Sequence, residues 1–512
     1  MGTVSLGSTA GKWIMVSTIL ASAMVFIDAT ALNVVLPSLQ KGLKASGPDL
    51  FWVLNAYMLM LASLILIGGT LGDQVGRKKV FMAGTFIFIL GSAACGFAGT
   101  ATMLILCRII QGVGGAFMVP GSLSLISSSI DEHERGKAIG TWSSVTTLVT
   151  IGGPVLGGAL ADAGLWRYIF FINVPIGLLA LLFLWKKVRE SKEPGDGQGL
   201  DFPGAILIAL GLASLTFGFL RMPAYGWAHP QVYGTIGAGL LLLVVFIAVE
   251  HKSPHPMMPL GLFRNLTFSG VNLLSFFLYA ALGASLLFLS LNLVQVQGYS
   301  QLESGLTFLP FTALMILLAR FAGSLADKYG PRWFLVVGPC VAGLGMLILS
   351  FVKQTGGPAD YWTTFFPGVL VFGLGMSFTV APLTATVMGA VSDHLSGTAS
   401  GVNNAITRIA GVFATAIFGA LAVLFFATSL QQRIQSLPLD QRQQQAVMAQ
   451  VANLGDAMPP PGIATGYHAA IVKAYHEGFI SAYGKIMSIT ACLAFLGGLM
   501  SWLFVRSPRV KT

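Results

Sequence analysis

The chain has 512 residues, of which 55% are hydrophobic and only 9% are charged. Because a soluble domain carries roughly 25% charged residues, this composition excludes a water-soluble protein and indicates one that is largely embedded in a membrane. The formal net charge of +10 does not predict nucleic-acid binding, since the cations lie in short segments between apolar stretches.

Apolar stretches of membrane-spanning length follow one another along the chain. A helix needs about 20 mainly apolar residues to cross the hydrocarbon core, and an open sheet cannot cross it. The alternating pattern of a membrane barrel is absent from the sequence. We therefore predict an all-α polytopic membrane protein with fourteen spanning helices. They are expected at about 13–38, 51–71, 80–99, 101–126, 137–161, 167–186, 203–221, 232–250, 267–295, 302–326, 333–352, 363–391, 397–427 and 479–505.

The distribution of Lys and Arg predicts the orientation of these helices. The two termini and the loops after even-numbered helices carry seventeen of these cations, whereas the loops after odd-numbered helices carry eight. Because cations accumulate on the cytoplasmic side, both termini are expected in the cytoplasm. The first apolar run begins at about Trp13 and is too long for a signal peptide, so we expect an uncleaved first helix.

One polar loop occurs twice. Residues 69–79 (GTLGDQVGRKK) follow the second expected helix, and residues 323–332 (GSLADKYGPR) follow the tenth. At an offset of 261 residues, the fourth helix also matches the twelfth and the fifth matches the thirteenth. The sequence therefore predicts two six-helix halves that are parallel repeats, a layout typical of transporters with a site at the interface between the halves.

The repeat also predicts how the chain is divided. We expect an N-terminal half at 1–190, a linker with two inserted helices at 191–265, and a C-terminal half at 266–512. The last half contains one long external loop at 428–478. Residues 440–451 have the composition of a short surface helix, but the loop as a whole is expected to be a solvated tether.

Six motifs resemble those of one transporter family. They are the loop at 69–79 and the segments 28–37, 108–116, 152–158, 166–177 and 401–408. In this order, over almost the whole chain, they resemble the major facilitator superfamily, and within it the fourteen-spanner drug:proton antiporter family. The resemblance implies the major facilitator fold, no cofactor beyond a proton gradient, and a place in the bacterial cytoplasmic (inner) membrane.

Asp28 is the only acid deep within an apolar stretch, where burial favours the neutral, protonated form. It is a candidate proton carrier, or else a structural acid bonded to Thr30 or to a neighbouring helix. Arg108, inside the fourth helix, needs a buried acceptor and is a candidate partner of Asp28, or else a fixed hydrogen-bond hub. Gln111 lies on the same helical face, and the resemblance implies that Arg108 and Gln111 relay protons.

The loop residues are candidates for gating. Gly69 and Gly76 are expected to allow close packing and a tight turn. Asp73 is expected to cap a neighbouring helix, near Ser396, and the resemblance implies a cytoplasmic latch; the alternative is topology anchoring by the cations alone. The gating candidates are Gly69, Asp73, Gly76, Arg77, its repeat counterpart Asp327, and the packing and hinge residues Gly153 and Pro154.

Several residues are weaker candidates for lining a substrate cavity, because aromatic side chains also face lipid and its interface. Arg408, inside the thirteenth helix, is a candidate anchor for an anionic group. Glu303 is either an interfacial acid or a second proton site. The cavity candidates are Asn33, Trp52, Asn55, Tyr57, Asn272, Phe276, Tyr279 and Arg408.

We expect a secondary active transporter and not an enzyme, since no nucleophile, metal-ligand or cofactor pattern is recognisable in the sequence. The favoured hypothesis is proton-coupled efflux of amphipathic, cationic small molecules by alternating access. One alternative is an exporter of anionic or lipid-like metabolites anchored by Arg108 and Arg408, and another is a non-transporting membrane sensor. The expected partners are the substrate, protons and the lipid bilayer; a periplasmic adaptor is a further candidate, and nucleic acid is not expected.

Overall fold

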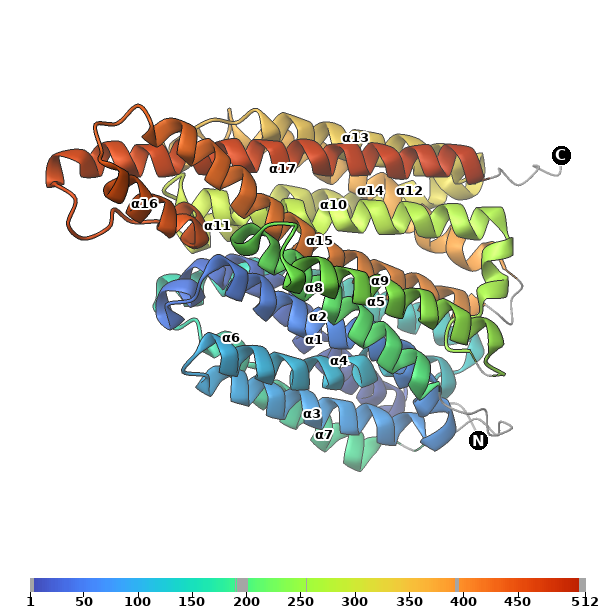
Figure 1. Cartoon of the computed structure of the whole chain (residues 1–512). Helices are drawn as coiled ribbons and strands as arrows, with labels where there is room; N and C mark the ends of the chain where they lie inside the picture. Colours follow the sequence, from blue (N-terminus) through green and yellow to red (C-terminus); the bar gives the residue numbers. More distant parts are fainter. Residues whose placement is uncertain (1–3, 189, 191–200, 255, 392–395, 506–512) are drawn as a thin grey trace. The chain divides into compact units, whose positions relative to one another are not determined.

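The computed structural model describes residues 4–188, 190, 201–254, 256–391 and 396–505 (Figure 1). These residues form helices and no strand, which confirms the all-α prediction. The long helices are α1 (Thr9–Leu43), α2 (Gly47–Val75), α3 (Arg77–Phe97), α4 (Ala101–Ser129), α5 (Glu132–Asp162), α7 (Asn173–Lys187), α8 (Phe202–Tyr225), α9 (Pro230–Lys252), α10 (Leu266–Gln295), α12 (Leu309–Tyr329), α13 (Arg332–Ser350), α14 (Phe365–Gly389), α15 (Ser396–Ile434) and α17 (His468–Phe504). The short ones are α6 (Tyr168–Phe171), η1 (Leu260–Arg264), α11 (Gln301–Thr307), η2 (Pro358–Asp360), α16 (Gln441–Ala449), η4 (Gln450–Asp456) and η5 (Thr465–Tyr467).

Thirteen helices of the described chain are long and apolar enough to cross a membrane. The remaining expected span corresponds to α5, in which the apolar stretch found among the described residues is Leu148–Asp162. Two expected spans contain a break: α6 is followed by α7, and α11 by α12. The count of fourteen is therefore close to what the structure contains.

The internal contacts divide the chain into two compact units. The first comprises 1–32, 52–215 and 237–260; the second comprises 33–51, 216–236 and 261–512. In the first unit α3 packs along α4 and α7, and in the second α13 packs along α14 and α17 (Figure 1).

Equivalent glycines bring equivalent helices together in the two repeats. A Cβ on Gly114 in α4 would overlap the backbone of Phe88 in α3, and a Cβ on Gly375 in α14 would overlap the backbone of Ala342 in α13. Small residues let helix backbones approach closely in membranes. The repeated loop also keeps its turn: the glycine before α3, Gly76, has a φ of 128°, and the glycine before α13, Gly330, has a φ of 85°.

The expected tether at 428–478 is mostly structured, so that prediction is wrong. α15 continues to Ile434 and α17 starts at His468, while α16 begins with a capping box formed by Asp440 and Gln443. Val447 and Leu454 are completely buried. The hydroxyl of Tyr475 in α17 donates to the Val447 carbonyl at 3.1 Å. Apolar anchors spaced among polar residues therefore hold this segment against the ends of the long helices.

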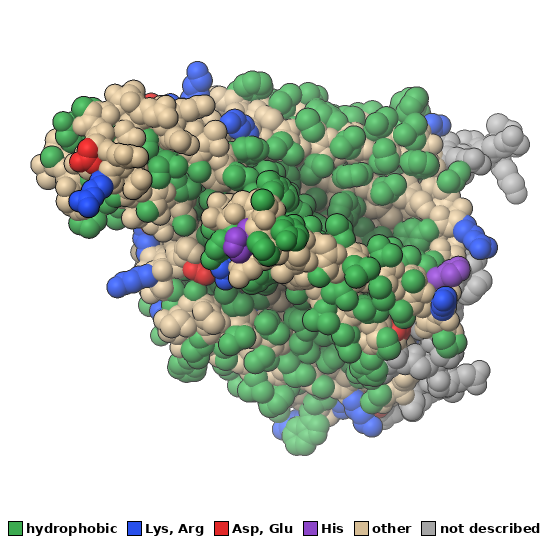
Figure 2. Space-filling view, in the orientation of Figure 1, with side chains coloured by type: hydrophobic (Ala, Val, Ile, Leu, Met, Phe, Trp, Pro, Cys, Tyr) green, Lys and Arg blue, Asp and Glu red, His purple; other side chains and the backbone are tan. Residues whose placement is uncertain are grey.

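The surface carries the signs of a lipid-facing protein. Figure 2 shows hydrophobic side chains gathered along the helices, with most of the Lys, Arg, Asp and Glu side chains near their ends. On α9, Leu241 and Val244 are 63% and 62% exposed. Because a soluble protein would not leave such a helix face in water, these exposed side chains are suited to contact with lipid.

Candidate functional site

A buried polar cluster joins α1 to α4. Arg108 Nη1 donates to Asp28 Oδ2 at 2.5 Å and to Gln111 Oε1 at 2.7 Å. Gln111 Nε2 donates to Asp28 Oδ1 at 2.9 Å. The three residues are at most 1% exposed. The structure thus brings together the three residues that the sequence nominated for proton coupling, while their role stays a prediction.

Arg108 also has partners on α2. Its Nε donates to the carbonyl of Val53 at 3.2 Å, and its guanidinium carbon lies 4.3 Å from the centre of the Tyr57 ring. A cation above an aromatic face is stabilised by the ring's negative surface. Arg108 is therefore held by a carboxylate, an amide oxygen, a backbone carbonyl and a ring. Tyr57, suggested by the sequence as a cavity residue, instead supports this cation.

The cluster is chemically balanced in its ionised form. Each oxygen of Asp28 accepts one hydrogen bond, and the single negative charge is paired with the single positive charge of Arg108. A buried charge pair is tolerated when its hydrogen bonds are satisfied. A proton placed on Asp28 would leave Arg108 with Gln111 Oε1, Val53 O and the Tyr57 ring as partners. Arg108 therefore has partners besides Asp28.

The glycines of α5 set the position of α1 beside Asp28. A Cβ on Gly153 would overlap Oγ1 of Thr30, and a Cβ on Gly157 would come within 2.8 Å of the carbonyl oxygen of Ala31. Thr30 itself donates to the carbonyl of Phe26 at 2.7 Å and not to Asp28. The motif that contains Gly153 and Pro154 is thus a packing element against the turn that carries the acid.

The second repeat has no counterpart of the cluster. The offset of 261 residues places Val369 and Phe372 at the positions of Arg108 and Gln111. Phe372 is buried against Phe311, with ring centres 4.9 Å apart. Two apolar residues of α14 therefore stand where α4 carries Arg108 and Gln111.

The remaining cavity candidates of the second unit lie mainly on α10 and α15. Asn403 Nδ2 donates to Asn272 Oδ1 at 3.0 Å and to Ser275 Oγ at 2.7 Å. Tyr279 and Arg408 are half-buried. Within the described residues, Arg408 has no ion-pair partner.

The other cavity candidates are an aromatic residue in contact with another ring, two half-buried residues and a buried asparagine. Phe276 packs edge-on against Phe413, with ring centres 5.9 Å apart. Asn33, in the second unit, and Trp52, in the first, are half-buried. The side-chain amide of Asn55 is fully buried, and its atoms have no hydrogen-bond partner among the described residues.

The loop at 69–79 differs from expectation in one respect. The close helix approach is at Gly68, where a Cβ would overlap the Ala116 carbonyl. A Cβ at Gly69 would lie 3.7 Å from the Cβ of Pro120, which is an ordinary van der Waals distance. Gly76 does make the expected turn. The side chains of Asp73 and Asp327 lie outside the described part of the structure, and so do residues 392–395, next to the proposed capping target; the latch stays a prediction.

Sequence reasoning missed Glu190. Its carboxylate accepts from the backbone N–H groups of Lys78 at 2.9 Å and Lys79 at 3.2 Å, and so caps the N-terminus of α3. The ammonium of Lys78 in turn donates to the last carbonyls of α7, those of Trp185 and Val188. No local motif marks Glu190, because its partners are more than a hundred residues away in the sequence.

Glu303 has a structural partner set. Its carboxylate accepts from the backbone N–H of Ser300 at 2.8 Å, while the Ser300 hydroxyl accepts from the N–H of Glu303 at 3.1 Å. This capping box starts α11. The geometry therefore favours the interfacial acid over a second proton site.

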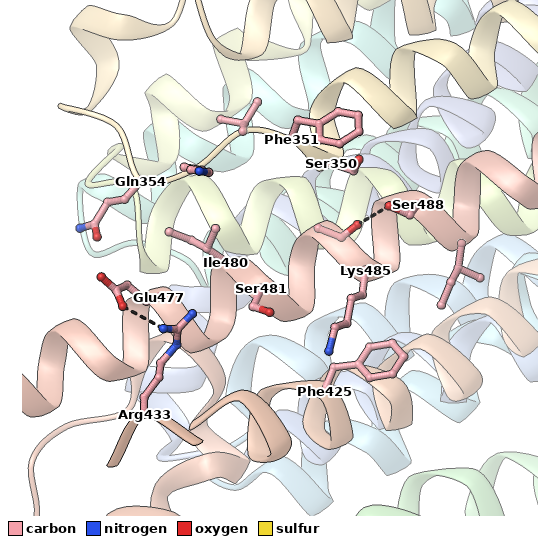
Figure 3. A pocket seen from close by; sticks show the side chains of 14 residues that line it. Ser350, Phe351, Gln354, Phe425, Arg433, Glu477, Ile480, Ser481, Lys485 and Ser488 are labelled. Carbon is pink, nitrogen blue, oxygen red and sulfur yellow. Dashed lines mark hydrogen bonds and ion pairs between the residues drawn. The ribbon is translucent and has the colours of Figure 1, made fainter. Parts of the chain in front are cut away.

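A surface cavity of about 880 Å³ lies between the ends of α13 and α15 and the middle of α17 (Figure 3). Arg433 and Glu477 form an ion pair of 3.1 Å on its wall, and Lys485 extends toward the Phe425 ring, 5.2 Å from its centre. None of the residues nominated from the sequence as site residues lines it.

Comparison with known proteins gives a consistent result. The model of the "Major Facilitator Superfamily" matches residues 18–415. The chain is 30% identical to the tetracenomycin C resistance and export protein of Streptomyces glaucescens, over 94% of this chain and 89% of that protein. It is 30% identical to the multidrug resistance protein Stp of Mycobacterium tuberculosis (strain CDC 1551 / Oshkosh), over 94% and 90%.

Solved structures resemble the fold. A bacterial homolog of the human lysosomal transporter Spinster covers 98% of this chain and 100% of its own, with a TM-score of 0.69 and 19% identity. The xylose transporter XylE from E. coli covers 98% and 97%, with a TM-score of 0.58 and 14% identity. At sequence identities this low, the similarity shows a shared fold and nothing further about these proteins.

Proposed function

Because this chain belongs to the major facilitator superfamily, we propose that it is a proton-driven exporter of small amphipathic molecules, cationic ones among them. Relatives named for drug resistance and export, aligned over nearly the whole chain, support efflux. The observation that carries the coupling is the buried contact of Asp28 with Arg108 and Gln111. The proposal includes the bacterial cytoplasmic membrane, with both termini in the cytoplasm.

The proposed coupling uses the two states of Asp28. When Asp28 is ionised, its charge is paired with Arg108. A proton from outside neutralises Asp28 and removes the pairing, and Gln111 Oε1 and the Val53 carbonyl keep Arg108 in place. Release of the proton to the inside restores the ion pair. Alternating exposure of the acid to the two sides would then link each proton entering to substrate leaving.

The test is efflux from proteoliposomes with an imposed pH gradient. The variants are Asp28→Asn, Asp28→Glu and a matched change of an exposed acid, Asp440→Asn. We expect Asp28→Asn to abolish gradient-driven efflux of a cationic dye, because asparagine cannot carry the proton. Asp28→Glu should retain part of it, and Asp440→Asn should be unchanged. Counterflow exchange of the dye without a gradient reports whether the Asn variant still binds and moves substrate.

Two results would contradict the proposal. Wild-type protein without any pH-dependent flux would point to a sensor. Dye efflux that survives in Asp28→Asn would remove the acid from coupling. The second candidate, an exporter of anionic molecules, is favoured by Arg408, which has no ion-pair partner among the described residues and lies on a half-buried stretch of α15. Loss of organic-anion transport in Arg408→Ala alone would support it.

A further inference from the structure

Two acids meet at the ends of the inserted helices. Asp201 directly precedes α8, and Glu250 lies in the last turn of α9. They belong to the same compact unit. Asp201 is 8% exposed and Glu250 is 2% exposed, although acidic side chains are almost never buried unless they are paired.

One oxygen of each acid has a donor. Asp201 Oδ1 accepts from the backbone N–H of Gly204 at 2.8 Å, and Glu250 Oε2 accepts from the backbone N–H of Met258 at 2.9 Å. The other two oxygens, Asp201 Oδ2 and Glu250 Oε1, are buried and have no donor among the described residues. Each acid is therefore satisfied on one side only.

The two orphaned oxygens face the same point. They lie 2.8 and 2.7 Å from the place where a Cβ on Gly204 would stand, so the two carboxyl groups are close neighbours. An ionised carboxylate has no donor, so two ionised groups cannot satisfy each other. One proton between them turns the two orphaned acceptors into a donor and an acceptor.

Within the part of the chain that the structure describes, no ion pair involves either acid. The N–H of Met258 is the donor found for Glu250 there. The two residues that follow Glu250, His251 and Lys252, are exposed at the end of α9. Burying both carboxylates in their ionised form without a cation costs much more free energy than burying the pair with one proton shared between them.

We propose that Asp201 and Glu250 hold one proton between them, as a second protonation site distinct from Asp28. This proton joins the start of α8 to the end of α9, and the bond from Met258 extends the connection to the segment that leads into η1. The inference does not depend on the direction of transport or on the substrate.

The first test is infrared difference spectroscopy of the purified full-length protein in lipid nanodiscs at neutral pH. We expect wild-type protein to show the carbonyl stretch of a protonated carboxylic acid that is lost in both Glu250→Gln and Asp201→Asn. The amide of Glu250→Gln can donate to Asp201 Oδ2, so this variant should fold. Asp28→Asn should keep the band, which separates this site from the proposed coupling site. No loss of the band in either variant would overturn the proposal.

The second test is thermal unfolding as a function of pH, in the wild type, Glu250→Gln and a control, Glu303→Gln. A native state that binds one proton more than the unfolded chain loses stability as the pH rises. We expect the melting temperature of Glu250→Gln to fall less with rising pH than that of the wild type and of the control. Equal slopes would overturn the proposal. Stabilisation of the wild type by added sodium at fixed pH, absent in the variant, would also overturn it in favour of a bound cation.

Discussion

Arg108 is the residue with the most partners in the polar cluster, and each partner uses a different part of the guanidinium. Nη1 donates hydrogen bonds to Asp28 and Gln111, and Nε donates one to the Val53 carbonyl. The planar face of the guanidinium lies over the Tyr57 ring. A lysine would provide the positive charge, but it has neither the several N–H donors of the guanidinium nor its planar face. The cluster therefore depends on the shape of this cation as well as on its sign.

Arg108→Lys tests that dependence. We expect it to lose about 1.5–3 kcal/mol of stability, the range for a hydrogen bond to a charged group, and to slow efflux. The control is Arg221→Lys, since Arg221 also lies over aromatic rings but is exposed. Thermal unfolding of both purified variants would measure the difference. Equal stability of the two variants would show that charge alone holds the cluster together.

At this scale the sequence identifies some residues and hides others. Asp28 stands out because it is the only acid deep in an apolar stretch, and Arg108 because a cation inside a span needs a buried acceptor; Gln111 follows from its helical spacing to Arg108. Glu190 and the Asp201–Glu250 pair are hidden because they sit at the ends of spans, where charged residues are ordinary. Only the three-dimensional contact of distant segments distinguishes them from surface charges.

Glycines allow the backbones of α3 and α4, and those of α13 and α14, to approach each other closely. Gly91 and Gly345 occupy equivalent positions in α3 and α13, and a Cβ on either would overlap the backbone of Gln111 or Phe372, respectively. Gly114 and Gly375 do the same from the partner helices. The repeats therefore share a helix contact that is independent of the side chains that differ between them.

Gly375→Ala and Gly411→Ala should have opposite effects. The added methyl group at Gly375 would push α14 away from Ala342 in α13, so we expect a lower melting temperature and lower yield. At Gly411 in α15 a Cβ would meet nothing within 4 Å. There the loss of glycine's flexibility should raise stability by about 0.5–1 kcal/mol or leave it unchanged. Comparable destabilisation by both changes would argue against the close contact.

Hydropathy predicts where most helices lie but not where they break or how far they extend. The break between α6 and α7, and that between α11 and α12, fall within continuous apolar runs. α15 ends later than expected because polar helical turns follow its apolar part, and α17 begins earlier because polar helical turns precede its apolar part. These features depend on packing against neighbours, which hydropathy does not encode.

The whole molecule is a duplicated transporter whose two repeats keep the same helix pairing but carry different interiors. Polar residues around Arg108 in the first repeat correspond to Val369 and Phe372 in the second. The sequence predicts the duplication from its loops and glycines. It does not predict the structured segment around α16, because its few buried apolar residues are spaced among many polar ones.

The proposed orientation can be tested with single cysteines. In a background without the four native cysteines, we would introduce Gln435→Cys after α15 and Lys252→Cys at the end of α9, both exposed positions. A membrane-impermeant maleimide should label Gln435→Cys in intact cells and label Lys252→Cys only after the membrane is opened. The reverse pattern would place the termini outside.

The balanced charge of the Asp28–Arg108 pair has an electrical consequence. The ionised pair carries no net charge, so the protonated site carries one positive charge. Exchange of one proton for a singly charged cationic molecule would then move no net charge across the membrane. Exchange for an uncharged molecule would move one charge inward, and the membrane potential would drive it with about 2.3 kcal/mol per 100 mV. The same site would thus export neutral molecules more strongly from energised cells and cations at a rate insensitive to voltage.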